Sequence, residues 1–170
     1  RSLGISKTNI DFFNKNITNI NKFLWKINKI EIFTKNLKNE KVLNFENQNQ
    51  LFSIIKNYEL YDHLFKELKS KKLFKKKKNF TKKILEKKEY SLIINCDFQN
   101  FITKKFFHKK IYKDYDSYAH TALVNHKKKI NNNVAIQIFT EKGPLAFLPI
   151  SKTETSVVYS ARGSKYINLK

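Results

Sequence analysis

The chain is long enough for one domain with a sizeable core, and it is strongly basic. It has 170 residues, with 35 Lys and Arg against 14 Asp and Glu and a formal net charge of +21. Its single cysteine, Cys96, excludes an internal disulfide framework and favours a reducing compartment. No apolar run approaches the roughly 20 residues of a transmembrane helix, so we expect a cytoplasmic protein, with peripheral membrane attachment left open. Because the chain begins with Arg1 and contains no Met, we also expect an internal piece of a longer protein.

The basic residues are almost all lysines, since only Arg1 and Arg162 are arginines. Lys, Asn, Ile and Phe share A/T-rich codons, so the composition favours a bacterial or organellar protein from an A/T-rich genome, with lysines on a solvated surface. Residues 69–88 are densest in lysine and leave two alternatives open: a nucleic-acid-binding surface and attraction to an anionic bilayer. Recognition of bases and phosphates favours arginine, so nucleic acid is the less favoured partner.

The N-terminal segment predicts a helix that Ser6, Thr8 or Asn9 could cap. Apolar residues recur there at steps of three and four, namely Ile10, Phe13, Ile17, Ile20 and Leu24. Trp25 then closes the segment, and we expect it to anchor the core.

Three strand-like runs follow at residues 29–34, 41–45 and 51–55, where apolar and polar residues alternate. The last two are expected to form a hairpin. A second helix should begin with Asn57 as its cap, and its apolar stripe consists of Leu60, Leu64 and Leu68. The lysine-rich stretch after it is predicted to form two short strands.

Residues 90–95 form a continuous apolar run that predicts a buried strand. Cys96 is expected to be buried beside it, and a short helix should follow over residues 100–107. A strand is predicted over residues 119–125. Residues 134–160 then hold three strand-length runs separated by two polar turns, which predicts an antiparallel meander. The fold class is therefore α+β, with a mixed or antiparallel sheet and flanking helices.

The spacing of residues alone indicates few catalytic or binding sites. The four histidines make no metal-site spacing, and the chain has no GxSxG, GxGxxG or GxxxxGK[ST] motif. Asp97 follows the apolar run at residues 90–95, where a carboxylate could accept hydrogen bonds from a ribose. The alternative, a helix N-cap, is equally favoured.

Several segments, taken in order, resemble the flavin-dependent aromatic-ring hydroxylases of ubiquinone biosynthesis, which have the p-hydroxybenzoate-hydroxylase-like fold. The segments are RSLGIS at 1–6, IKNYEL at 55–60, LIINCDFQNFITKK at 92–105, YAHTALV at 118–124, and AxQxF, GPLAFLP and SVVYS within 134–160. Together they span nearly the whole chain. The resemblance implies partial FAD-binding elements with inserted strands in residues 1–107 and a substrate-domain meander in residues 108–170.

The resemblance also implies a cofactor, a substrate and site residues. FAD would be contacted by Arg1, Asn57 and Asp97, with NAD(P)H or another electron donor, and no side chain need be catalytic. The substrate would be a polyprenylated aromatic ring, and the partner could be a ubiquinone-biosynthesis complex. The residues that could line its pocket are Phe139, Leu145, Phe147 and Leu148, for which ordinary sheet core is the alternative.

Overall fold

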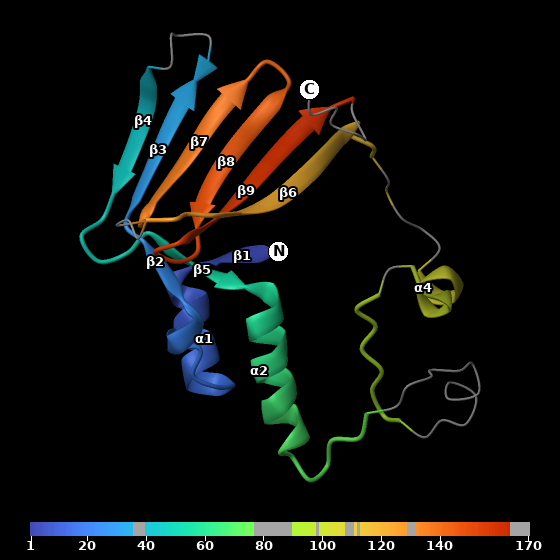
Figure 1. The fold of residues 1–170 in the computed structure, drawn as a ribbon. Helices are drawn as coiled ribbons and strands as arrows, with labels where there is room; N and C mark the ends of the chain where they lie inside the picture. Colours follow the sequence, from blue (N-terminus) through green and yellow to red (C-terminus); the bar gives the residue numbers. More distant parts are fainter. Residues whose placement is uncertain are drawn as a thin grey trace. The chain divides into compact units, whose positions relative to one another are not determined.

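The computed structural model describes residues 1–35, 40–76, 90–97, 99–107, 111, 113–128 and 132–163. They form two compact units, one of Arg1–Lys72 with Tyr115–Lys170 and the other of Leu73–Asp114. The first unit holds two sheets and the helices α1 and α2 (Figure 1), so its class is α+β as expected. None of the helices in the described ranges is long and apolar enough to cross a membrane.

The smaller sheet contains three strands in the order β1-β5-β2, with β1 at Ser2–Ile5, β2 at Trp25–Ile27 and β5 at Phe52–Lys56. Its central strand separates two apolar clusters, because neighbouring residues of a strand point to opposite faces. Ile55 packs with Ile10 of α1 and Leu60 of α2, whereas Ile54 packs with Ala135 of the larger sheet. The small sheet is therefore a middle layer between the helices and the larger sheet.

The larger sheet contains six strands in the order β4-β3-β7-β8-β9-β6. The strands are β3 at Lys29–Thr34, β4 at Lys41–Glu46, β6 at Ser117–Asn125, β7 at Val134–Thr140, β8 at Gly143–Pro149 and β9 at Glu154–Arg162. Only β3 and β7 pair in parallel, so the sheet is mixed, and the predicted meander is confirmed as β7-β8-β9. The sheet joins strands from both sides of the predicted boundary at residue 107, which stays a prediction.

The two faces of the larger sheet have different neighbours. One face, here called the junction face, carries Ala135, Phe139, Leu148 and Glu154, and its base packs on the small sheet through Ala135 and Leu148. The opposite face, here called the outer face, carries directly paired residues of neighbouring strands, namely Ile136, Phe147, Val157 and Ala122. The side chains of the two faces alternate along each strand.

The first helix is shorter than its apolar pattern predicts. α1 spans Lys7–Asn16, and Ser6 caps it by accepting from the backbone N of Asn9 at 3.2 Å. The chain leaves the helical conformation at Ile17, and the segment after it is held back on the helix because Asn14 Oδ1 accepts from the backbone N of Ile20 at 2.9 Å. The prediction that the helix reaches Leu24 is therefore wrong, although Ile20 is fully buried.

The second helix begins where the sequence predicts. α2 spans Asn57–Lys69, but its cap position is Lys56, which makes no side-chain capping bond. The predicted cap at Asn57 is therefore wrong. In the apolar stripe Leu60 is buried and Leu64 packs on the core, while Leu68 is exposed.

Two predictions about strands are wrong. The hairpin between residues 41–45 and 51–55 is wrong, because β4 pairs with β3 and β5 lies in the other sheet. Residues 90–95 form no strand, and Leu92 and Ile94 are 75% and 76% exposed, so this prediction is also wrong. Cys96 is exposed rather than buried. The two short strands predicted in the lysine-rich stretch fall largely outside the described residues.

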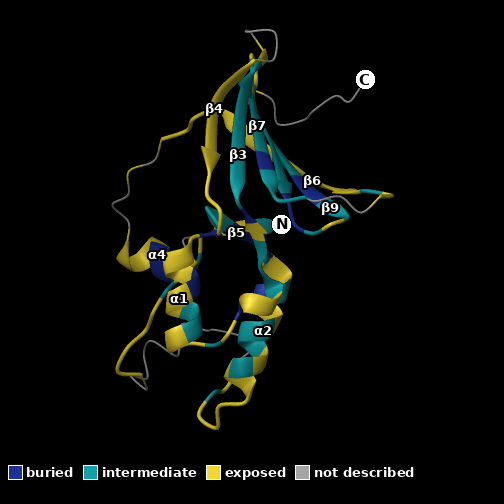
Figure 2. Cartoon of the chain, turned by 90° about the vertical axis from the view of Figure 1, so that its left-hand side faces the viewer, coloured by how far each residue is buried: buried dark blue, intermediate teal, exposed yellow. Residues whose placement is uncertain are grey.

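Figure 2 shows how burial is distributed over the chain. The buried positions concentrate in the small sheet, the adjoining helix faces and the base of the larger sheet, whereas β4 is exposed along its whole length. The six-stranded sheet is intermediate in exposure over much of its area.

Candidate functional site

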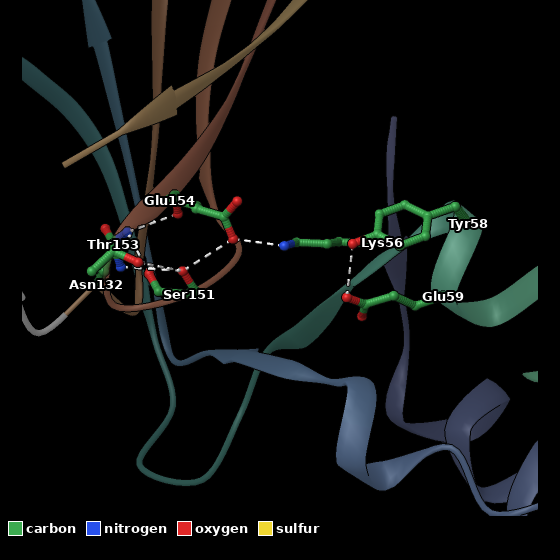
Figure 3. Close-up of polar contacts among 7 residues, drawn as sticks. All are labelled: Lys56, Tyr58, Glu59, Asn132, Ser151, Thr153 and Glu154. Atoms are coloured by element: carbon green, nitrogen blue, oxygen red, sulfur yellow. Dashed lines mark hydrogen bonds and ion pairs between the residues drawn. The ribbon is translucent and has the colours of Figure 1, made fainter. Parts of the chain in front are cut away.

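An ion pair joins the two sheets at the end of β5. Lys56 Nζ lies 2.6 Å from Glu154 Oε2, and both side chains are partly shielded from solvent. The hydrogen bond from Lys56 to Glu154 raises the pKa of Lys56 above its ordinary value, while partial burial opposes the shift. Ser151 Oγ lies 3.4 Å from the same carboxylate oxygen. Figure 3 shows this carboxylate between the lysine and the β8-β9 turn.

Two of the predicted cofactor residues meet beside this ion pair. The backbone N of Asn57 donates to the backbone O of Arg1 at 3.0 Å, and Ser2 pairs directly with Lys56. Asn57 is the first residue of α2, and the N-terminus of a helix favours anions. A guanidinium and an amide beside such a terminus can bind a phosphate or a polyol. The backbones of Arg1 and Asn57 are thus adjacent, which the chain order alone does not indicate.

Asn132 is a hydrogen-bonding hub at the base of the larger sheet. Its side-chain Nδ2 reaches the backbone O of Ser151 at 2.9 Å, Thr155 Oγ1 at 3.1 Å and the backbone O of Glu154 at 3.3 Å. Its backbone O accepts from Trp25 Nε1 at 2.5 Å. Trp25 is therefore an anchor as predicted, with its indole N–H fixed to the segment before β7.

A hollow of about 250 Å³ lies on the outer face of the larger sheet. Its lining is mostly apolar, and its residues are Val124, His126, Asn132, Val134, Ile136, Phe147, Pro149, Thr155 and Val157. At its polar end His126 Nε2 lies 2.8 Å from Thr155 Oγ1. Glu154 and Thr155 are consecutive in β9, so the sheet-joining carboxylate and this hydroxyl lie on opposite faces.

The four predicted pocket residues divide between the two faces of the sheet. Phe139 and Leu148 lie on the junction face, where Leu148 packs beside the small sheet and Phe139 is 46% exposed. Leu145 and Phe147 lie on the outer face, and Phe147 lines the hollow. One ligand on one face therefore contacts at most two of the four side chains.

Asp97 belongs to the second compact unit, whereas Arg1 and Asn57 belong to the first. Its Oδ1 accepts from the backbone N of Gln99 at 2.9 Å, and its backbone O accepts from Thr103 Oγ1 at 2.8 Å. The cap of the helix α4, at Phe101–Phe106, is Asn100, whose Oδ1 accepts from the backbone N of Thr103. The N-cap alternative for Asp97 is therefore wrong, and its cofactor role stays a prediction.

The sequence does not indicate the Lys56–Glu154 pair or the His126–Thr155 pair. Lys56 and Glu154 are 98 positions apart, and no spacing rule connects them. Thr155 stands in a turn-like polar stretch, so its place at the head of a strand was not indicated. Within the described ranges, no three His, Cys, Asp or Glu side chains gather as a metal site would require.

No protein-family model matches the chain. No curated protein matches it at a significant level.

Proposed function

We propose that this chain is the middle part of an FAD-dependent monooxygenase that hydroxylates an aromatic ring of a polyprenylated ubiquinone precursor. One observation carries the proposal beyond the sequence resemblance. Arg1 and Asn57, which the resemblance assigns to the flavin, adjoin the Lys56–Glu154 pair. That pair joins their sheet to β9 of the meander, which the resemblance assigns to the substrate.

The donor types at the end of β5, a guanidinium and an amide, are ones that can bind a polar part of FAD. The guanidinium of Arg1 and the amide of Asn57 would hold a phosphate or the ribityl hydroxyls beside the N-terminus of α2. When bound, the flavin would supply the oxygen chemistry, with electrons from NAD(P)H or another donor. The protein's own contribution would be to orient the ring and exclude water.

The substrate ring would lie against the junction face. Phe139 is on this face and 46% exposed, so its apolar side chain would shield the ring from water, whereas Leu148 is packed against the small sheet. Leu145 and Phe147 point to the outer face and would support the sheet from behind. The Lys56–Glu154 pair would fix the spacing between the cofactor residues and this wall.

The protein encoded by the extended reading frame tests the proposal. We expect it to carry a GxGxxG segment before Arg1 and a Gly-Asp motif after Lys170, and to retain FAD on purification. Arg1→Ala and Asn57→Ala should each lower the FAD content, whereas Lys7→Ala, at an exposed position of α1, should leave it unchanged. A protein that lacks flavin and binds a short RNA in a strongly salt-dependent manner would instead support the nucleic-acid alternative.

A further inference from the structure

The hollow on the outer face has the features of a small-molecule site separate from the junction face. It is slightly smaller than the roughly 300 Å³ at which pockets for drug-sized ligands begin. Its floor consists of Ile136, Phe147 and Val157, which sit side by side on three neighbouring strands. Its lining in the described part of the chain contains no Lys, Arg, Asp or Glu. An ion placed there would lose hydration without compensation, so the lining favours a neutral molecule.

The polar end leaves one hydrogen-bond donor available in either tautomer of His126. Thr155 Oγ1 already accepts from Asn132 Nδ2. If the threonine hydroxyl donates to His126 Nε2, the imidazole proton is on Nδ1 and has no acceptor among the described residues. If Nε2 instead donates to Thr155, the hydroxyl proton is the one left over. Both arrangements leave a single N–H or O–H without an acceptor among the described residues.

We propose that this hollow binds a neutral molecule with an apolar body of about one substituted ring and a single hydrogen-bond-accepting oxygen. The apolar body would cover Ile136, Phe147 and Val157, and the oxygen would accept from the His126–Thr155 pair. The site does not depend on the proposed function, because it lies on the face opposite to Phe139 and Leu148.

The chain contains a suitable reporter for binding. Trp25 is the only tryptophan, and its indole N–H is bonded to the backbone of Asn132, which lines the hollow. Its indole signal in a ¹H–¹⁵N NMR spectrum should shift on addition of 4-ethylphenol and of ethylbenzene. The two probes share their apolar body and differ in the oxygen, so the ratio of their dissociation constants isolates the polar contact.

Variants of the chain distinguish the contribution of the polar end to binding from that of the apolar floor. The double variant His126→Phe/Thr155→Val should weaken 4-ethylphenol relative to ethylbenzene by about three- to tenfold, as loss of one hydrogen bond does. Thr121→Val makes the same change at an exposed position on the opposite face of β6 and should leave the ratio unaltered. Val157→Phe fills the hollow and should abolish the shift with both probes. Thermal unfolding establishes that each variant is folded.

Three results would overturn the proposal. The first is no shift of the Trp25 signal by either probe in the unmodified chain, and the second is an unchanged ratio in the double variant. The third is undiminished binding of both probes to folded Val157→Phe.

Discussion

Lys56 and Glu154 form the ion pair that connects the two sheets, with 2.6 Å between Nζ and Oε2. Lys56 ends β5 and Glu154 begins β9, so the pair joins two strands that are far apart in the chain. The adjoining residues extend this connection in both directions. The backbone N of Asn57 donates a hydrogen bond to the backbone O of Arg1, and Thr155 belongs to the polar end of the hollow on the outer face.

Removal of this ion pair should destabilise the contact between the sheets. We expect Lys56→Met and Glu154→Gln to be non-additive in denaturant unfolding, with a coupling free energy of about 1 kcal/mol, since the pair is only partly shielded from water. Lys152→Met, at an exposed lysine in the β8-β9 turn, is the matched control and should show no coupling to Glu154→Gln. Additive effects of the Lys56 and Glu154 changes would mean that the pair contributes nothing to stability.

The ion pairs of Glu31 and of Lys56 should make stability depend on pH in opposite directions. The hydrogen bond from Lys41, at 2.5 Å, lowers the pKa of Glu31 below its ordinary value of 4.5, and Lys29 adds to this effect. The stability that the ionised Glu31 carboxylate contributes is present above pH 4.5 and is lost as the pH falls through its pKa in the folded state. Glu154 raises the pKa of Lys56 above 10.5. The stability that the charged Lys56 contributes is therefore present below pH 10.5 and is lost as the pH rises through its pKa in the folded state.

Unfolding free energies measured across pH test both signs. Glu31→Gln should reduce the loss of stability on acidification, and Lys56→Met should reduce the loss at alkaline pH. Glu141→Gln, in the exposed β7-β8 turn, serves as a control for the acid range. An acid limb that is identical in Glu31→Gln and the unmodified chain would contradict the assignment.

Of the three glycines in the chain, Gly143 should be the least replaceable. Its φ is +140°, and a Cβ at this position would overlap the carbonyl oxygen of Ser160 in β9. We expect Gly143→Ala to cost about 2–4 kcal/mol, from backbone strain and from overlap with a neighbouring strand. Gly4→Ala is the control, because its Cβ would lie at an ordinary 3.6 Å from the Phe52 ring. Equal melting temperatures for the two variants would show that β8 can shift away from β9.

The sequence predicted individual elements better than their partners. The meander, α2 and the strand at Ser117–Asn125 were recovered because periodicity and turn residues are local signals. The strand that pairs with β4 was not recovered, because the alternation of apolar and polar residues in β4 fits either sheet. The end of α1 is not predicted, because the apolar pattern continues to Leu24 although the chain leaves the helix at Ile17 and folds back onto Asn14.

The candidate site was only partly accessible to sequence reasoning. Arg1 and Asn57 were singled out by resemblance, and their proximity results from the pairing of β1 with β5. The four predicted pocket residues are apolar members of the meander, but strand alternation places Phe139 and Phe147 on opposite faces. His126 and Thr155 become a pair only through the pairing of β6 with β9.

The most direct measurement of the central claim is oxygen incorporation by the protein of the extended reading frame. The purified protein would be supplied with FAD, NAD(P)H, ¹⁸O₂ and a prenylated phenol, and the product analysed by mass spectrometry. We predict one ¹⁸O atom in a new ring hydroxyl, with a lower yield in Arg1→Ala and Asn57→Ala than in Lys7→Ala. A flavin-loaded protein that oxidises NAD(P)H but leaves several prenylated phenols free of ¹⁸O, or one that never binds FAD, would contradict the account.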